Sequence, residues 1–250
     1  MKKVIMVTGG AGGIGEAVCE KFAQELKSNS TIILHYHSSA DNAKRIEARL
    51  KKQYGSTVDL IKCDLTDESA VENMARALLA KYKKIDVLVN NAGFVADKEL
   101  KDRTWGDFEK TFRVNLFAPF LLSKILGQEM FKSKGGHIVN VSSISGMDAF
   151  IPSSIDYDAS KAALNAVTRD LATAFAPHVN VNAIAPGWVD TPMNKEFTEA
   201  EKKELADTNL KKRFAAPSEM AGLIYFLTTE AANFINGSII PIDGGLNRYF

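Results

Sequence analysis

Tyr157 and Lys161 stand four residues apart in the stretch YDASK, so they share one face if this stretch is helical. The phenol of tyrosine titrates near ~10, which is too high for ready proton exchange at neutral pH. An ammonium about 4 Å away, at an effective dielectric of about 20, favours the phenolate by roughly 4 kcal/mol, or about three pKa units. The spacing therefore predicts that Lys161 brings the pKa of Tyr157 to about 7.

A serine pair precedes this tyrosine. Ser142 and Ser143 end the apolar stretch HIVNVSS, which reads as a strand. Two hydroxyl donors aimed at one oxygen stabilise the negative charge that grows there during hydride transfer to a carbonyl carbon. Ser143 and Tyr157 are the candidate donors.

A glycine-rich turn offers a place for a cofactor. The stretch VIMVTGGAGGIG predicts a strand over residues 4–7 and a helix over residues 14–26. Glycine tolerates positive φ and close approach of a phosphate, and a helix start carries a partial positive charge. Thr8-Gly9 and Gly13-Ile14-Gly15 therefore predict a pyrophosphate site. A P-loop is excluded, because Glu16 stands where its lysine is needed.

Strand and helix patterns alternate along the whole chain and must position these groups. The clearest helical stretches lie over residues 68–82, over 107–132 with an interruption at Asn115 and Pro119, and from Tyr157 to about 176. The alternation predicts an α/β fold: a single doubly wound Rossmann-type domain over residues 1–250, with a seven-stranded parallel sheet and helices on both faces. Residues 188–213 are long for a connection and are predicted to form a substrate lid.

The end of the second predicted strand bears on the choice of cofactor. Tyr36, His37 and Ser38 occupy the corner where NAD-binding folds usually place a carboxylate that repels a 2′-phosphate. No carboxylate stands there, which favours NADP over NAD, although the dedicated arginine is also absent. Asp64, after the third strand, is either an adenine contact or a helix-capping or loop aspartate.

Composition excludes several classes of function. The chain has 250 residues, 46% hydrophobic and 24% charged, and its net charge of +1 predicts neither a nucleic-acid nor a membrane partner. Cys19 and Cys63 are far apart and without CxxC pairing, which predicts reduced thiols and no metal centre. The apolar run after Lys2 and Lys3 stops at Thr8, too early for a signal peptide, so the expected location is cytoplasmic.

Six motifs follow in order along the chain: TGxxxGxG at residues 8–15, NNAG at residues 90–93, Asn115, Ser143, YxxxK at residues 157–161, and Pro186-Gly187. With these motifs the chain resembles the short-chain dehydrogenases/reductases over its full length. The resemblance implies NAD(P)(H)-dependent interconversion of a ketone and a secondary alcohol.

The resemblance also implies roles for single residues. Ser143 would polarise the substrate oxygen, Tyr157 would donate or accept the proton, Lys161 would hold the nicotinamide ribose, and Asn115 would position a proton-relaying water. The predicted cofactor contacts are Gly9, Gly13, Ile14, Gly15, Tyr36, His37, Ser38, Asp64, Asn91, Gly93, Tyr157, Lys161, Pro186, Gly187 and Thr191. One extra residue between Ser143 and Tyr157 leaves open whether Ser142 or Ser145 takes part.

The substrate is less constrained. The pocket candidates are apolar: Phe94, Val95, Ala149, Phe150, Ile151, Trp188 and Met193. The chain looks most like the 3-oxoacyl-thioester (acyl carrier protein) reductases. For those that serve a carrier protein, Lys132, Lys134 and His178 are the available basic residues at the pocket mouth, and residues 211–213 add a second basic cluster. Sugar, polyol or cyclic-ketone dehydrogenases of the same family are the alternative, and a non-catalytic cofactor-sensing protein is the alternative of another class.

Members of this family are commonly tetramers. The stretch FAPFLLSKILGQEMF is apolar on more of its circumference than one packed face requires. We therefore expect a homotetramer in which this helix forms a subunit contact.

Overall fold

The computed structural model describes residues 2–147, 151–194 and 197–246. Its centre is a seven-stranded, wholly parallel sheet in the order β3-β2-β1-β4-β5-β6-β7, so the predicted fold class is confirmed. The strands are β1 (Lys3–Val7), β2 (Ser30–Tyr36), β3 (Thr57–Lys62), β4 (Val87–Asn90), β5 (Gly136–Val141), β6 (Val179–Pro186) and β7 (Ile239–Ile242).

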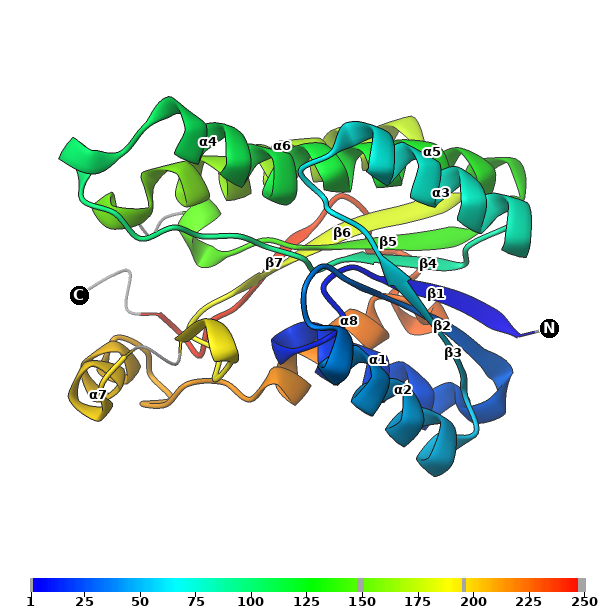
Figure 1. The fold of residues 1–250 in the computed structure, drawn as a ribbon, viewed down its shortest axis with the longest axis horizontal. Coiled ribbons are helices and arrows are strands. Elements are labelled where there is room, and N and C mark those ends of the chain that lie inside the picture. Colours follow the sequence, from blue (N-terminus) through cyan, green and yellow to red (C-terminus); the bar gives the residue numbers. More distant parts are fainter. Residues whose placement is uncertain (1, 148–150, 195–196, 247–250) are drawn as a thin grey trace.

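Helices cover both faces of this sheet (Figure 1). On one face lie α3 (Glu68–Tyr82), α4 (Trp105–Phe112), α5 (Ala118–Lys132) and α6 (Ile155–Ala174); on the other lie α1 (Gly13–Leu26), α2 (Ala40–Tyr54) and α8 (Pro217–Phe226). Alternate residues of β1 feed the two cores: Ile5 and Val7 join the α1 side, and Met6 joins the α5 side. Both faces of the strand are buried, which explains its unbroken apolar run.

The strand order reverses between β1 and β4. The chain moves outward from β1 through β2 to β3, and then crosses back to β4 on the other side. In open parallel sheets ligands bind outside the carboxyl ends of the strands at such a switch point. The loops after β1 and β4 are therefore the expected walls of a binding site.

The helix predicted over residues 107–132 is three connected pieces. α4 begins at Trp105 after a capping box in which Thr104 and Asp107 bond each other's backbone. A π-helical turn, Arg113–Phe117, then joins α4 to α5. The predicted interruption at Asn115 is therefore a widened turn, and Pro119 sits in the first turn of α5, where proline is tolerated.

The segment after β6 contains the short helix α7 (Glu199–Asp207), which stands apart from the two helical layers in Figure 1. Its far end is fastened to the chain after β7, because the amides of Leu210 and Lys211 donate to the carbonyls of Gly245 and Gly244. Among the described residues, no helix is long and apolar enough to cross a bilayer.

Candidate active site

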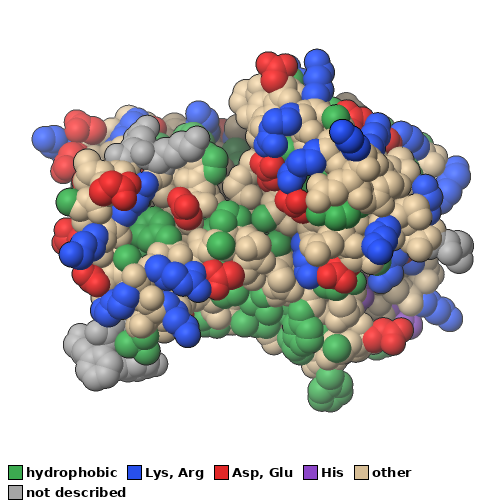
Figure 2. Space-filling model, turned by 90° about the horizontal axis from the view of Figure 1, so that it is seen from below, with side chains coloured by type: hydrophobic (Ala, Val, Ile, Leu, Met, Phe, Trp, Pro, Cys, Tyr) green, Lys and Arg blue, Asp and Glu red, His purple; other side chains and the backbone are tan. Residues whose placement is uncertain are grey.

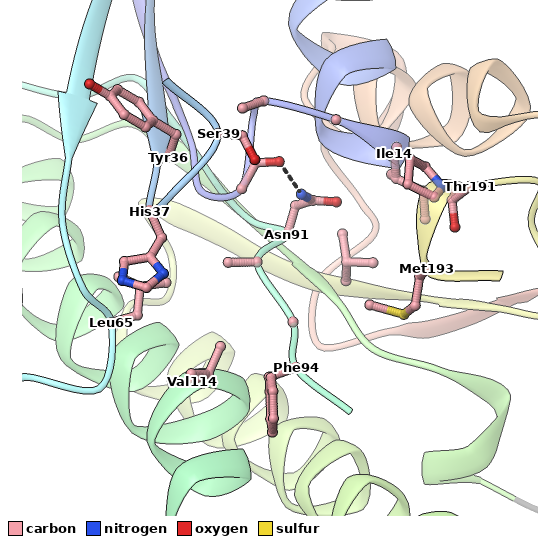
Figure 3. A pocket seen from close by; sticks show the side chains of 18 of the residues that line it. Ile14, Tyr36, His37, Ser39, Leu65, Asn91, Phe94, Val114, Thr191 and Met193 are labelled. Atoms are coloured by element: carbon pink, nitrogen blue, oxygen red, sulfur yellow. Dashed lines mark hydrogen bonds between the residues drawn. The ribbon is translucent and has the colours of Figure 1, made fainter. Parts of the chain in front are cut away.

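A cavity of about 820 Å³ opens at the carboxyl edge of the sheet, beside the switch point (Figure 3). Side chains from the loops after β1, β2, β3, β4, β5 and β6 line it. Ser143, Tyr157 and Lys161 stand at one end, and Tyr36, His37 and Ser38 at the other. All of the predicted catalytic and cofactor-contact residues line the cavity except Gly15 and Asn115.

The glycine turn after β1 suits a phosphate. Gly9 and Gly13 have φ of +64° and +53°, which L-residues with side chains rarely adopt. The start of α1 has no side-chain cap, so its first N–H groups stay available to an anion. These features fit a dinucleotide pyrophosphate, which Gly9, Gly13 and Ile14 would hold from one wall of the cavity.

Gly15 has a packing role, and its predicted contact with a cofactor stays a prediction. A Cβ there would lie 2.2 Å from the carbonyl oxygen of Gly9 and 2.6 Å from Nδ2 of Asn91. The glycine is needed because α1 crosses directly behind the turn.

Asn91 fastens this turn to β4. Its Nδ2 donates to the carbonyls of Thr8 (2.9 Å) and Gly9 (3.2 Å), and its own N–H donates to Oγ1 of Thr8 (2.9 Å). Figure 3 shows a hydrogen bond from the Asn91 side chain. Asn91 also lines the cavity. The two asparagines at the end of β4 therefore have different roles. Asn91 faces the cavity, whereas Asn90 points into the core, where its amide donates to Ser123 and Asn140.

His35 braces the same turn from β2. Its Nδ1 accepts the N–H of Gly9 (3.1 Å), so Nε2 carries the proton and donates to the carbonyl of Cys63 (3.1 Å). Burial lowers the pKa of His35 from 6.5 to about 4. A neutral histidine thus links the turn to the end of β3. Sequence reasoning missed it, because a lone histidine inside a β-branched strand gives no signal.

The adenosine end of the cavity contains a single carboxylate, that of Asp64, among its lining residues. Oδ1 of Asp64 accepts from the N–H and hydroxyl of Thr66 (2.9 and 2.7 Å), and these bonds lower its pKa. Its other oxygen lies 3.7 Å from Nε2 of His37. Asp64 therefore acts as a loop aspartate that also lines the cavity, and its contact with an adenine stays a prediction.

The predicted acid–base residues lie where β5 meets α6. The phenol of Tyr157 hydrogen-bonds the Ser143 side chain. Nζ of Lys161 lies 5.5 Å from the Tyr157 ring centroid and donates to the carbonyl of Val141 (2.8 Å). Gly146 allows α6 to come this close to the turn after β5, since a Cβ there would lie 2.6 Å from the backbone of Lys161.

The predicted pKa near 7 for Tyr157 is wrong for these contacts. Burial raises the pKa of Tyr157 to about 12, and it outweighs the Ser143 hydrogen bond. Burial also lowers the pKa of Lys161 to about 8. The ammonium is directed at Val141, so within the chain the phenol stays protonated at neutral pH and serves as a hydrogen-bond donor.

The structure separates the three candidate serines. Ser143 faces Tyr157, whereas the hydroxyl of Ser142 donates to the carbonyl of Lys161 (3.3 Å). Ser145 turns toward Asp158 and donates its N–H to Oγ of Ser143 (3.1 Å). Ser142 and Ser145 thus stabilise the turn that carries Ser143.

Asn115 holds a loop. Its Oδ1 accepts the N–H of Phe94 (2.8 Å), and its Nδ2 donates to the carbonyl of Phe94 (2.9 Å) and to Oγ of Ser160 (3.0 Å). The π turn brings the amide to Phe94, the residue after Gly93. The predicted role of Asn115 in positioning a water stays a prediction.

Comparison with known proteins places this geometry in a family. A family model described as enoyl-(acyl carrier protein) reductase matches residues 9–247. The 3-oxoacyl-[acyl-carrier-protein] reductase FabG of Aquifex aeolicus is 34% identical over 98% of this chain and 97% of its own. This chain belongs to the short-chain dehydrogenase/reductase family.

Other short-chain dehydrogenases/reductases show the range of substrates. The cyclopentanol dehydrogenase of Comamonas sp. is 32% identical over 97% of this chain and 96% of its own. The crystal structure of L-sorbose reductase from Gluconobacter frateurii, complexed with NADPH and L-sorbose, matches with a TM-score of 0.90 at 27% identity, covering 100% of this chain and 98% of that one. The resemblance seen in the motifs is thus confirmed: the protein is an NAD(P)-dependent oxidoreductase acting on CH–OH/C=O groups.

The substrate wall of this dehydrogenase/reductase differs in part from the predicted one. Phe94 and Met193 line the cavity, but Val95, Ile151 and Trp188 do not. Trp188 packs against Phe197 and Phe214 at the base of the segment before α7. Ala149 and Phe150 lie outside the described residues. Sequence reasoning missed Val114, which lies next to Phe94, and Leu65, which lines the cavity beside His37 (Figure 3).

The basic residues predicted at the pocket mouth are elsewhere in the protomer. Lys132 and Lys134 precede the start of β5, and His178 precedes the start of β6. The cavity lies at the other end of these strands, about 20 Å away at ~3.3 Å per residue. In the second cluster, Arg213 pairs with Glu219.

Lys110 is a cation at the cavity that sequence reasoning missed. Its Nζ lies 4.2 Å from the ring centroid of Phe94, and no described carboxylate is within ion-pair distance. Lys110 and Val114 are four residues apart on the face of α4 and the π turn that meets the cavity. The four-residue spacing of Lys110 and Val114, just before Asn115, could have identified both as cavity residues from the sequence.

Proposed function

We propose that this short-chain dehydrogenase/reductase uses NADPH to reduce the keto group of a 3-oxoacyl thioester to a secondary alcohol. The observation that carries the proposal is the pairing of Ser143 with a protonated Tyr157 in a cavity of about 820 Å³. Bound NADPH would supply the hydride.

The proton arrangement supports the direction of reduction. A neutral phenol and a serine hydroxyl donate to a carbonyl oxygen, and both bonds strengthen as charge grows on that oxygen. Tyr157 then gives up its proton to the new alkoxide. The Lys161 ammonium, held by the carbonyl of Val141, stabilises the phenolate that remains.

The adenosine end supports NADPH over NADH. His37 and Ser38 line it together with Ser39 and Asn42, and the carboxylate of Asp64 is engaged by Thr66. Arg45 is directed away toward Glu16, so this chain offers hydroxyl, imidazole and helix N–H groups to a 2′-phosphate in place of an arginine. The His37→Asp variant should weaken NADPH more than NADH in fluorescence titrations. Equal loss for both would contradict the preference.

The cavity wall supports an acyl thioester. Phe94, Met193 and Val114 form an apolar surface for a chain, and Lys110 offers a cation to the phosphate of a phosphopantetheine arm. A sugar would find few polar side chains along this wall.

A substrate panel tests the function. Loss of nicotinamide absorbance should be fastest with acetoacetyl-CoA and slower with cyclopentanone and L-sorbose. Crotonyl-CoA separates carbonyl reduction from reduction of a carbon–carbon double bond. The Lys110→Ala variant should raise KM for acetoacetyl-CoA, with KM for cyclopentanone and Kd for NADPH unchanged. Faster turnover of a sugar or cyclic ketone would favour the alternative dehydrogenases, and NADPH binding without turnover of any carbonyl would favour the cofactor-sensing protein.

Two separate apolar surfaces support a homotetramer. Phe117, Phe120 and Phe131 on the π turn and α5 are 52%, 43% and 37% exposed. Phe226 of α8 and Phe234 form the second surface, and Figure 2 shows apolar side chains gathered along one edge of the face seen there. A tetramer built from two kinds of two-fold contact needs two separate contact surfaces on each chain. We place the protein in the cytoplasm, in keeping with its two free cysteines.

A further inference from the structure

A buried ion pair lies next to the catalytic tyrosine. Nη1 of Arg103 is 2.9 Å from Oδ1 of Asp156, and the two side chains are 3% and 0% exposed. Asp156 directly precedes Tyr157 in the first turn of α6, and Arg103 ends the loop that begins after β4 at Gly93. The hydroxyl of Thr111, from α4, donates to the second oxygen of Asp156 (2.6 Å).

Arg103 also hydrogen-bonds two segments near Tyr157. It donates to the carbonyls of Ala96 (2.5 Å) and Lys98 (3.3 Å) in its own loop. It further donates to the carbonyl of Ser153, in the segment that leads into α6. The N–H of Lys98 bonds the same Ser153 carbonyl (3.1 Å). One guanidinium thus joins the loop after β4 to the chain before Tyr157.

Asp158 fastens the same segment from the other side of Tyr157. Its carboxylate accepts the N–H of Ile151 (2.9 Å) and the hydroxyl of Ser154 (3.4 Å), and it bonds Ser145 in the turn that carries Ser143. The residues on either side of the tyrosine therefore hold residues 151–154. Asp158 holds them directly, and Asp156 holds them through Arg103.

Stability alone does not account for this pair. Two buried charges lose their hydration, and apolar residues of similar volume are often at least as stable. Nε of Arg103 is moreover buried without a hydrogen-bond partner among the described residues, which adds a further cost. The pair instead fixes the position of the loop after β4 relative to the first turn of α6.

We propose that Arg103 and Asp156 are positioning residues of this enzyme. They fix the phenol of Tyr157 relative to Ser143, because they hold the loop after β4 and the chain before Tyr157 in one arrangement. The inference rests on the proposed function for its kinetic readout. It adds two positioning residues that lie outside the catalytic group itself.

The test compares Asp156→Asn, Arg103→Lys and the apolar double variant Arg103→Met/Asp156→Leu with the wild-type enzyme. Well below the melting temperature, Asp156→Asn should lower kcat for the preferred carbonyl by roughly tenfold to a hundredfold and raise its KM. Kd for NADPH should stay the same. Arg103→Lys, which keeps the charge, should recover part of the loss. The double variant should regain thermal stability without regaining kcat.

Leu50→Ala on α2 is the matched control, because it removes a buried side chain far from these loops. It should lower the melting temperature and leave kcat unchanged. If the Arg103 and Asp156 variants behave like this control, with lower stability and unaltered kcat and KM, the pair is only structural and the inference is wrong.

Hydrogen exchange keeps this test apart from the proposed function. Asp156→Asn should speed amide exchange over residues 96–103 and 151–161 together, with the β1–α1 turn unchanged. An enzyme that reduces no thioester but shows this paired change would overturn the proposed substrate and support the positioning role. Exchange that changes in neither loop would overturn the positioning role, whatever the substrate.

Discussion

His35 should make the folded protein sensitive to mild acid. Its imidazole is 2% exposed, and protonation would remove the Nδ1 lone pair that accepts the N–H of Gly9. The pKa falls from 6.5 to about 4 on folding. At about 1.4 kcal/mol for each pKa unit, this difference corresponds to about 3 kcal/mol.

The sign follows from proton binding. Between pH 6.5 and about 4 the unfolded chain binds a proton at this histidine and the folded chain does not, so the free energy of unfolding rises with pH over this window. The contribution is therefore complete above pH 6.5 and is lost as the pH falls toward 4. NADPH affinity should decline over the same range, because the turn that holds the pyrophosphate loses its brace.

Urea unfolding at a series of pH values measures this effect. His35→Asn keeps an acceptor for Gly9 but does not titrate, so its curve should be flatter than that of the wild type between pH 6.5 and 4. Its curve should lie lower at every pH because the bond to the Cys63 carbonyl is lost, so the slopes are the quantity compared. The control His178→Gln removes a histidine away from the cavity and should keep the wild-type slope. Parallel curves for His35→Asn and the wild type would refute the reasoning.

Four further outcomes are expected. Tyr157→Phe removes the proton donor and should lower kcat/KM by about 10² to 10⁴ in steady-state assays, while equilibrium titration gives an unchanged Kd for NADPH. Gly15→Ala places a Cβ 2.2 Å from the carbonyl of Gly9 and should cost about 1–3 kcal/mol in urea unfolding and weaken NADPH binding; wild-type values would show that α1 shifts freely. Because the pKa of Lys161 is about 8, the rate of carbonyl reduction should fall as the pH rises through 8, and a pH-independent rate would remove the ammonium from the mechanism. Phe120→Asp should shift the mass in light scattering to a smaller oligomer, whereas a monomeric wild type would contradict the tetramer.

Local sequence determined the elements of this protein and the chemistry they carry. Positive φ at Gly9 and Gly13, the unbroken apolar strands and the four-residue spacing of Tyr157 and Lys161 are consequences of residue type and short-range periodicity. These features are legible in a single chain, since each depends on neighbours within one or two turns. The fold class and the family followed from their order.

Contacts between distant segments were decided by the tertiary structure. The choice of Ser143 over Ser142 depends on how α6 crosses the end of β5, and the pKa of Tyr157 depends on burial that no spacing reveals. Lys132 precedes a strand whose other end meets the cavity, so its distance from the site is a property of the sheet. Arg103 and Asp156 are ordinary surface residue types in the sequence, and only packing makes them a buried pair. The protonation state, burial and orientation of these side chains depend on the residues that contact them in the folded protein. Those contacting residues are far away in the sequence.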